Sequence, residues 1–284
     1  MNRVLIIGGS GTVGREVVSQ LTQSGAQVRV MARDPEKARL PPPTQVVYGD
    51  LTRPETLDDS LKDIDTVFLV WVAPPTTVAP VIEAIATRAR RIVFLSAPLK
   101  TPHPLFQQPN AARDLGAKIE SAIEASALQW TFLRPGMFAA NATEWWGGQI
   151  RAGDVVRWPY LDVPTAPIDP RDIAAVAMRA LLEEKHVQAE YVLTGPQSLS
   201  HREQLSIIGT VIGRSLQIEE LSPDEARRVL LAIMPLPVIN MLLNAWGAAS
   251  GQPAFVTSTV EEITGTPART FLDWASDHAA KFQA

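Results

Sequence analysis

The sequence predicts an α/β protein in which a doubly wound parallel sheet is followed by a smaller, mostly helical C-terminal lobe. Short apolar runs alternate with segments whose apolar residues recur at helical spacing, which is typical of parallel strands joined by crossover helices. A glycine-rich turn directly follows the first apolar run, and the last part of the chain reads mainly as helices. Together these three observations predict the fold class.

The first predicted unit is a strand at Arg3–Ile7, a helix at Arg15–Leu21 and a second strand at Gln27–Met31. The turn between the first strand and the helix consists of Gly8, Gly9, Ser10, Gly11, Thr12, Val13 and Gly14. Strand, glycine turn, helix and strand is the context of a dinucleotide-binding fingerprint. The spacing fits G-x-G-x-x-G from Gly9 and G-x-x-G-x-x-G from Gly8. We therefore assign these turn residues to cofactor binding in a Rossmann-type domain.

The glycines of this turn are expected to serve different purposes. Gly8 and Gly9 allow a tight turn, and Gly11 allows a pyrophosphate to approach the backbone. Gly14 allows the helix to pack closely on the sheet, while the helix N-terminus presents free N–H groups to phosphates. The alternative is a glycine-rich turn that binds no ligand.

The end of the second strand indicates which dinucleotide is bound. Sites specific for NAD usually have an acidic residue there, which binds the ribose 2′-hydroxyl. Arg33 occupies that place, and its planar guanidinium suits a 2′-phosphate, so we expect NADP(H) in preference to NAD(H). In the alternative interpretation, Arg33 is a solvated loop charge and Asp34 binds the ribose.

The rest of the sheet follows the same alternation. Further strands are predicted at Gln45–Tyr48, Thr66–Val70, Arg91–Leu95, Trp130–Leu133 and Glu190–Leu193. Helices are predicted at Asp34–Ala38, Pro54–Leu61, Thr77–Arg90, Ala111–Ala125 and Pro170–Glu183. Pro41–Pro43 is expected to end the first of these helices. After the third strand, we expect Asp50 to bond the adenine amino group and Leu51 to pack on the ring, unless Asp50 only caps the next segment.

Ligands of open α/β sheets bind at the carboxyl edge of the strands, so residues there are candidates for the site. Ser96 follows the fifth strand, where it would face a nicotinamide and donate to a substrate carbonyl; alternatively it caps the strand end. Lys118 is expected to point from its helix toward the cofactor, or else to be solvated. The proline-rich loop Pro98–Pro109, which contains His103, either walls the pocket or is a surface loop.

Several motifs resemble the NmrA-like group of atypical short-chain dehydrogenases/reductases. They are residues 6–14, Arg33–Lys37, Gly49–Leu51, Lys118–Glu120, Thr131–Gly136 with Asn141, and Pro167–Ala174. The resemblance implies an NAD(P)-binding Rossmann core at residues 1–135. Residues 136–284 would complete the sheet at about 164–195 and form a substrate lobe. Relatives in this group reduce quinones, dyes, phenolics or polyketides, or bind NADP without turnover as redox-responsive regulators.

One departure from the parent dehydrogenases concerns proton donation. Those enzymes use Tyr-x-x-x-Lys, in which the lysine lowers the tyrosine pKa. Here Asp114 stands four residues before Lys118, so the usual donor is missing. We assign Lys118 and Ser96 as the catalytic candidates, with Lys118 holding the ribose or donating directly.

The substrate side is predicted from aromatic residues near the same edge. We assign Trp71, Phe138, Trp145, Trp146 and Trp158 as substrate-binding residues, since large aromatics form flat apolar walls. Core packing is the alternative for each of them. Because Trp145 and Trp146 are adjacent, we expect at least one to face a pocket or an interface.

The late part of the chain carries clear helix signals. Capping boxes start helices at Ser200 and Ser222, and His201 is expected at the surface. A short strand is predicted at Gln217–Glu220. The apolar segment Leu230–Trp246 must kink or split at its prolines and is expected to cover the substrate cleft as a lid, or to form a dimer contact. Aromatic residues Phe271, Trp274 and Phe282 mark a final helix.

Composition excludes several function classes. The net charge is −4 with mixed signs, which argues against nucleic-acid binding. There is no cysteine, and the four histidines lack ligand spacing, so no metal site is expected. No signal peptide or confident membrane span is visible, which predicts a cytoplasmic protein.

These observations favour an NADPH-dependent reductase of a hydrophobic aromatic, quinone-like or polyketide-type carbonyl, and a homodimer is possible. The alternatives are a non-catalytic NADP-binding redox sensor and a cofactor-independent isomerase or cyclase on the same fold.

Overall fold

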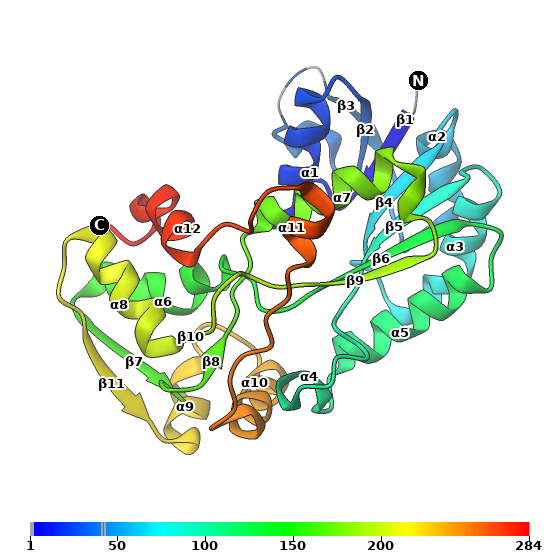
Figure 1. The fold of residues 1–284 in the computed structure, drawn as a ribbon. Coiled ribbons are helices and arrows are strands. Elements are labelled where there is room, and N and C mark those ends of the chain that lie inside the picture. Colours follow the sequence, from blue (N-terminus) through cyan, green and yellow to red (C-terminus); the bar gives the residue numbers. More distant parts are fainter. Residues whose placement is uncertain (1–2, 41, 43, 284) are drawn as a thin grey trace.

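The computed structural model describes residues 3–40, 42 and 44–283. The outer ends of the predicted ranges 1–135 and 136–284, and Pro41 and Pro43 of the predicted helix stop, lie outside these residues. Figure 1 shows a sheet with helices on both faces and, beside it, a lobe built from the later part of the chain.

A seven-stranded sheet forms the larger part of the molecule, in the order β3-β2-β1-β4-β5-β6-β9. Every neighbouring pair is parallel. The strands are β1 (Arg3–Ile7), β2 (Gln27–Ala32), β3 (Gln45–Tyr48), β4 (Thr66–Val70), β5 (Arg91–Leu95), β6 (Gln129–Pro135) and β9 (Ala189–Leu193). The order turns back between β1 and β4, which is the switch point where such sheets bind ligands. The predicted Rossmann-type α/β class is confirmed.

Two apolar layers sandwich the sheet because its central strands are buried on both faces. On one face, α1 (Thr12–Gln23), α7 (Pro170–Leu182) and α11 (Thr259–Thr264) pack on residues such as Ile6 and Phe68. On the other, α2 (Leu57–Leu61), α3 (Val78–Ala86) and α5 (Ala111–Glu124) pack on residues such as Leu5 and Val67. The predicted helix at Asp34–Ala38 is a single 3₁₀ turn, Pro35–Lys37.

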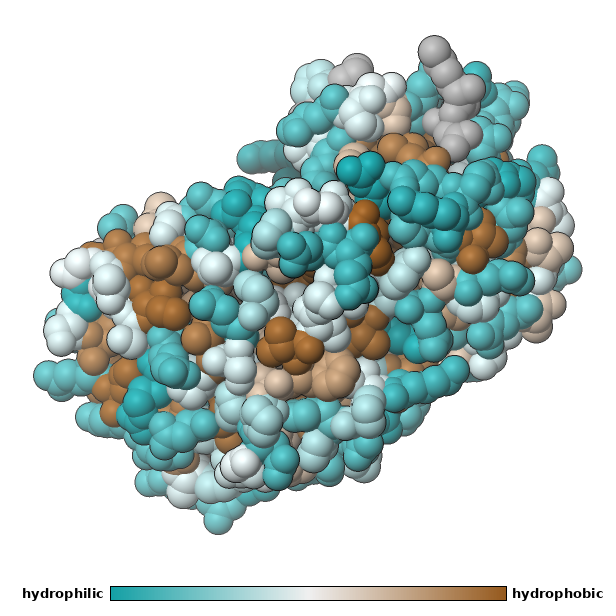
Figure 2. Space-filling model, in the orientation of Figure 1, coloured by the Kyte–Doolittle hydropathy of each residue, from teal (hydrophilic) through white to brown (hydrophobic). Residues whose placement is uncertain are grey.

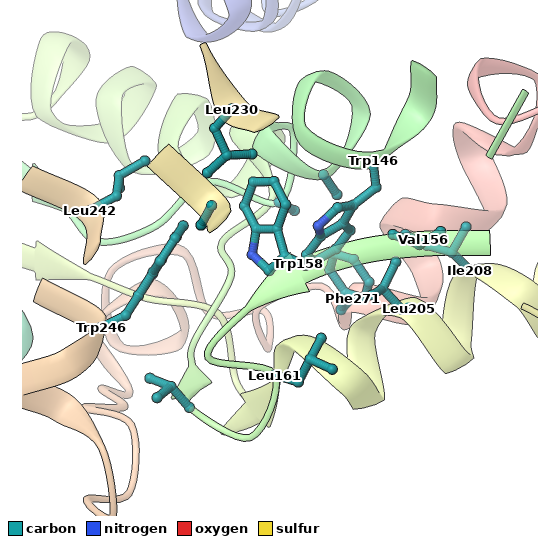
Figure 3. Packing of buried hydrophobic residues seen from close by; sticks show 14 of the residues in the cluster. Trp146, Val156, Trp158, Leu161, Leu205, Ile208, Leu230, Leu242, Trp246 and Phe271 are labelled. Atoms are coloured by element: carbon teal, nitrogen blue, oxygen red, sulfur yellow. The ribbon is translucent and has the colours of Figure 1, made fainter. Parts of the chain in front are cut away.

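The second lobe has its own core. Its elements are α4 (Pro104–Gln107), α6 (Asn141–Ala152), β7 (Val155–Pro159), β8 (Pro164–Thr165), β10 (Leu199–Ser200), α8 (His201–Ile212), β11 (Gln217–Leu221), α9 (Pro223–Leu230), α10 (Leu236–Ala249) and α12 (Phe271–Asp277). Figure 3 shows Trp158 lying beside Trp146 and below Leu230 in this core. In Figure 2, apolar residues gather on the lobe around α8 and α12, whereas the sheet domain shows a mostly polar face.

The lobe also differs from expectation in its details. The predicted strand near Gln217 pairs in parallel with β7, a strand that sequence patterning missed because its partner lies 62 residues later. The predicted loop after β5 contains the short helix α4, which His103 caps through its Nδ1. The Nε2 of His103 is 2.9 Å from the carbonyl oxygen of Pro253, so this histidine fastens two loops together. The helix that Ser222 caps ends at Leu230, and a second helix, α10, starts at Leu236 directly after Pro235, so the chain is split near its prolines as predicted.

The sheet and the lobe are joined by a charged cluster at the start of α7. Asp169 caps this helix through the backbone N–H of Arg171, and its other oxygen accepts from Nε of Arg269 at 2.8 Å. Arg269 also bonds Asp277 of α12 at 2.5 Å. Part of the motif Pro167–Ala174 therefore has a structural purpose, which is to hold the C-terminal segment against the sheet domain.

His201 corrects one prediction, since its side chain is fully buried and not at the surface. It lies among four indoles, the nearest being Trp246 with a ring-centre distance of 4.9 Å. Its Nδ1 donates to the carbonyl oxygen of Tyr160 at 3.0 Å. Burial lowers the pKa of His201 to about 4, although backbone hydrogen bonds oppose the shift.

Asp172 shows a pKa shift in the other direction. Burial raises the pKa of this carboxyl to about 6, and the backbone N–H of Arg269, which donates to Oδ2 at 2.8 Å, opposes the rise. An unfolded histidine titrates near ~6.5 and an unfolded aspartate near ~3.9. The folded protein therefore binds fewer protons at His201, and more at Asp172, than the unfolded chain does.

These shifts predict opposing pH effects on the free energy of unfolding. The contribution of His201 is fully present above pH 6.5 and falls by about 3 kcal/mol as the pH drops to 4. That of Asp172 instead falls by about 3 kcal/mol as the pH rises from 4 to 6. In urea unfolding, the stability of Asp172→Asn relative to the parent should rise across pH 4 to 6. The stability of His201→Gln relative to the parent should fall over the same range. If the difference in stability between a variant and the parent does not change with pH, the pKa shift assigned to that residue is contradicted.

Candidate cofactor and substrate site

The glycine turn is held together by contacts that only glycine permits. Gly8 has φ +90°, and a Cβ on Gly14 would lie 2.1 Å from the Gly8 carbonyl oxygen, far inside contact distance. A Cβ on Gly11 would meet only that same oxygen, at 3.4 Å. The backbone at Gly14 is therefore locked by packing, whereas the backbone at Gly11 is open.

An open groove of about 670 Å³ starts at this turn and follows the carboxyl ends of β1, β2, β3 and β4. Its lining includes the predicted cofactor residues Gly8, Ser10, Gly11, Arg33, Asp50 and Leu51. Gly11 is also the N-cap of α1, and no side chain caps this helix end. The groove therefore combines free helix N–H groups with a backbone that a phosphate can approach.

The other predicted turn residues support the groove from behind. Gly9 packs under Val30, where a Cβ would lie 2.7 Å from Cγ1. Val13 is buried in the layer between α1 and the sheet, and Thr12 opens the helix. Asp50 lines the groove, and its Oδ1 also accepts from the N–H and the hydroxyl of Thr52, each at 2.9 Å. Its contact with an adenine stays a prediction.

At the end of β2, Asp34 has an ion-pair partner and Arg33 has none within the described chain. Arg33 is exposed and has no hydrogen bond or ion pair within the described chain. The Oδ2 of Asp34 lies 2.6 Å from Nζ of Lys37, which also lines the groove. The acidic alternative for ribose binding is thus already paired with a cation, while the guanidinium stays available for an anion.

A second cavity of about 300 Å³ lies where the sheet domain meets the lobe. Its walls come from the chain just after β6, from α6, and from the α9–α10 segment that was predicted to act as a lid. The lining residues are Met137, Asn141, Glu144, Trp145, Ile233, Met234, Val238, Met241 and Leu242. Met137 follows the carboxyl end of β6 by two residues, so one wall of this cavity lies near the carboxyl edge of the sheet, where the groove also lies.

Of the aromatic residues assigned to substrate, only Trp145 lines this cavity. Trp146 and Trp158 have no exposed surface, so direct contact with substrate is closed to them, and they support Trp145 from the core. Trp71 packs toward α2, α3 and α5, with its indole N–H on the carbonyl of Ala73. Phe138 packs on the layer between the sheet and α1. The assignments of Trp146 and Trp158 are corrected, because the direction of their side chains, which composition does not reveal, places both in the core of the lobe. Trp71 and Phe138 are only partly buried, and their contact with substrate stays a prediction.

The two catalytic candidates lie on neighbouring elements. Nζ of Lys118 donates to the carbonyl oxygen of Pro75 at 3.1 Å, which ties α5 to the loop after β4. The Oγ of Ser96 is shielded from solvent, has no hydrogen-bond partner in the described chain, and faces Gly116 of α5. Their roles in catalysis stay predictions.

Sequence reasoning missed most residues of the second cavity. Asn141 belongs to the quoted motifs but was given no role, Met137 directly follows one of these motifs, and Glu144 precedes the adjacent tryptophans. The signal that could have found them is the start of a helix directly after a sheet strand at the ligand edge. The lining residues of α10 could not be assigned, since the path of the lid segment depends on tertiary packing.

Among known proteins, residues 8–192 match the NAD(P)H-binding family. The chain belongs to this family. It is 38% identical to the (4-alkanoyl-5-oxo-2,5-dihydrofuran-3-yl)methyl phosphate reductase of Streptomyces griseus, over 98% of this chain and 99% of the relative. It is 32% identical to the NAD(P)H azoreductase of Xenophilus azovorans, over 99% of each. These relatives confirm the predicted resemblance to NmrA-like atypical short-chain dehydrogenases/reductases.

Comparison with solved structures shows the same fold. The NADPH complex of an Escherichia coli NADPH-dependent quinone oxidoreductase superposes with a TM-score of 0.81 at 20% identity, covering 97% of this chain and 99% of the other. No helix within residues 3–40, 42 and 44–283 combines the length and apolar character needed to cross a membrane. Across the same residues, no group of three or more acidic or histidine side chains could hold a metal ion.

The groove residues of this NAD(P)H-binding protein fit the cofactor. The backbone at Gly11 is open, α1 has an uncapped N-terminus, and the unpaired Arg33 lies at the far rim. When bound, the nicotinamide supplies a hydride; the protein's contribution is to position it and exclude water.

Proposed function

We propose that the protein is an NADPH-dependent reductase of a hydrophobic aromatic or quinone-like substrate. The observation that supports this most directly is the presence of two hollows, a groove at the carboxyl ends of β1 to β4 and a cavity whose wall includes Met137, two residues after β6. One is polar at the glycine turn and suits a dinucleotide, and the other is lined mainly by apolar side chains and suits a flat ring system. The activities of the two reductase relatives agree with this proposal.

The preference for NADPH rests on the charges around Arg33. A 2′-phosphate would receive the unpaired guanidinium of Arg33, with the ammonium group of Lys37 nearby in the same groove. A 2′-hydroxyl would gain little there, since the carboxylate of Asp34 is engaged by Lys37.

Arg33→Ala should lower the preference for NADPH over NADH by about ten- to a hundredfold, the range expected for loss of a charge-assisted hydrogen bond. The measurement is the ratio of the two dissociation constants, read from energy transfer between tryptophan and the reduced nicotinamide. Arg88→Ala, which removes an exposed arginine paired with Asp58, is the matched control and should leave the ratio unchanged. An unchanged ratio in Arg33→Ala would remove the basis for the NADPH assignment.

Turnover is tested with 9,10-phenanthrenequinone as the acceptor, by following NADPH oxidation. Steady oxidation above the rate without protein supports the reductase proposal. Tight, oxidation-state-dependent cofactor binding without oxidation of NADPH on any quinone or aromatic ketone favours the redox sensor instead.

A further inference from the structure

The second cavity, which we propose binds the substrate, has an uneven distribution of charge. Of its nine lining residues, Glu144 is the one with an ionisable side chain, and Asn141 is the other strongly polar one. Glu144 lines the cavity with a side chain that is exposed to solvent. It makes no hydrogen bond or ion pair within the described chain, and no lysine or arginine lines the cavity. Glu144 lies in the first turn of α6, where a carboxylate interacts favourably with the helix dipole. That interaction does not explain why the residue lines an apolar cavity.

The apolar part of the cavity is suited to a broad ring system. Met137, Met234 and Met241 line it, which is half of the six methionines in the chain. Methionine side chains are flexible and polarizable, so they adapt to ligands of different outline. The partly exposed indole of Trp145 adds an aromatic group, which attracts cations in addition to packing on rings.

A third observation concerns the source of the proton that reduction of a carbonyl group requires. The three tyrosines of the chain are Tyr48, Tyr160 and Tyr191, and none stands four residues before Lys118. The Tyr191 hydroxyl is bonded to Nδ1 of His186 at 2.8 Å, at the outer sheet edge by β9. Reduction of a carbonyl takes up a hydride and a proton, so it needs a donor. Addition of a hydride to a delocalised cation needs none.

We propose that Glu144 is a specificity-determining residue that selects a planar cationic acceptor, such as an aromatic iminium or a carbocationic dye, and disfavours anionic substrates. The carbon of the cation accepts one hydride as its new C–H bond forms. The product is neutral, NADPH is oxidised to NADP⁺, and no proton is consumed. The inference rests on the proposed reductase function, and it sets this chain apart from the relative named for a phosphate substrate.

The test uses two acceptors with the same reactive ring. One is 10-methylacridinium, a cation, and the other is 10-(3-sulfonatopropyl)acridinium, which carries an added anionic group. Dissociation constants are measured by acridinium fluorescence in the presence of saturating NADP⁺, where no turnover occurs. NADPH oxidation with each acceptor is followed separately and corrected for the rate without protein.

We expect the methyl cation to bind about tenfold more tightly than the sulfonate, the size of effect that one partly solvated charge produces. Glu144→Gln should bring the ratio close to one, and Glu144→Lys should reverse it. Glu261→Gln, which removes a carboxylate from the first turn of α11 on the sheet domain, is the matched control and should retain the ratio.

The outcomes separate this inference from the proposed function. Charge-selective binding that is lost in Glu144→Gln supports the inference even if no acceptor is reduced, in which case the reductase function fails. Three results would overturn the inference, even if quinone reduction proceeds. The parent protein could bind both acceptors equally, the ratio of the two dissociation constants could be retained in Glu144→Gln, or neither acceptor could bind.

Discussion

Gly14→Ala is expected to abolish NADPH binding and to destabilise the fold. The new Cβ would lie 2.1 Å from the Gly8 carbonyl oxygen and 2.8 Å from the Gly9 Cα, and backbone atoms cannot rotate away as a side chain can. The turn would have to open, which separates α1 from β1. We expect a loss of about 1–3 kcal/mol in the free energy of unfolding and at least about a hundredfold in NADPH affinity, since the phosphate cradle is lost.

Gly11→Ala is the matched comparison for this prediction. Its Cβ meets the Gly8 oxygen at an ordinary 3.4 Å, so stability should stay close to that of the parent. The methyl group would nevertheless stand in the groove, so NADPH affinity should fall. Urea unfolding and fluorescence titration of both variants separate the two effects. A Gly14→Ala protein with unchanged stability would show that the turn is not packed as described.

Removal of either member of the buried pair Arg134–Glu120 should cause the largest loss of stability among the side-chain changes considered. Nε and Nη2 of Arg134 bond the two oxygens of Glu120 at 3.0 and 2.6 Å, and both side chains are almost fully buried. Glu190 also approaches Arg134, at 2.6 Å. Glu120→Gln leaves the guanidinium without its main counter-ion, and such a change typically costs about 3–5 kcal/mol.

The exposed pair Arg157–Glu219 provides the control. Glu219→Gln should lower the free energy of unfolding by less than about 1 kcal/mol, because both partners are solvated. The double variant Arg134→Met with Glu120→Leu should recover much of the loss, since it leaves no buried charge. Equal effects of Glu120→Gln and Glu219→Gln in urea unfolding would contradict the assignment of Arg134–Glu120 as a buried ion pair. The pair fixes α5 on β6, so it also positions Lys118.

The sheet domain could be predicted closely because its signals are local. The glycine turn, the apolar runs and the residue at the end of β2 each occupy a short stretch with one physical interpretation. The order of the strands then follows from the right-handed crossovers that parallel strands require. For this reason Gly11 and Arg33, which were assigned from the sequence, both line the groove, while their contact with a cofactor stays a prediction.

The lobe could be predicted only in part because its contacts are distant in sequence. The pairing of β7 with β11 joins segments about 60 residues apart, and the direction of Trp146 depends on that pairing. His201 follows a capping serine and looks like a surface residue, yet the first turn of α8 faces the tryptophan core. Glu144 lines the second cavity only because α10 and the turn before it lie against α6, and no local pattern encodes that contact.

The most direct test of the central claim is a single-turnover experiment with NADPH deuterated at one of the two C4 positions, then at the other. A reductase with one fixed cofactor pose transfers one hydride from one face, into the cavity lined by Met137 and Trp145. We expect a primary isotope effect on NADPH oxidation with one labelled form and none with the other. Two results would contradict the proposed reductase function. NADPH could bind without being oxidised by any quinone or acridinium acceptor, or both labelled forms could give equal isotope effects.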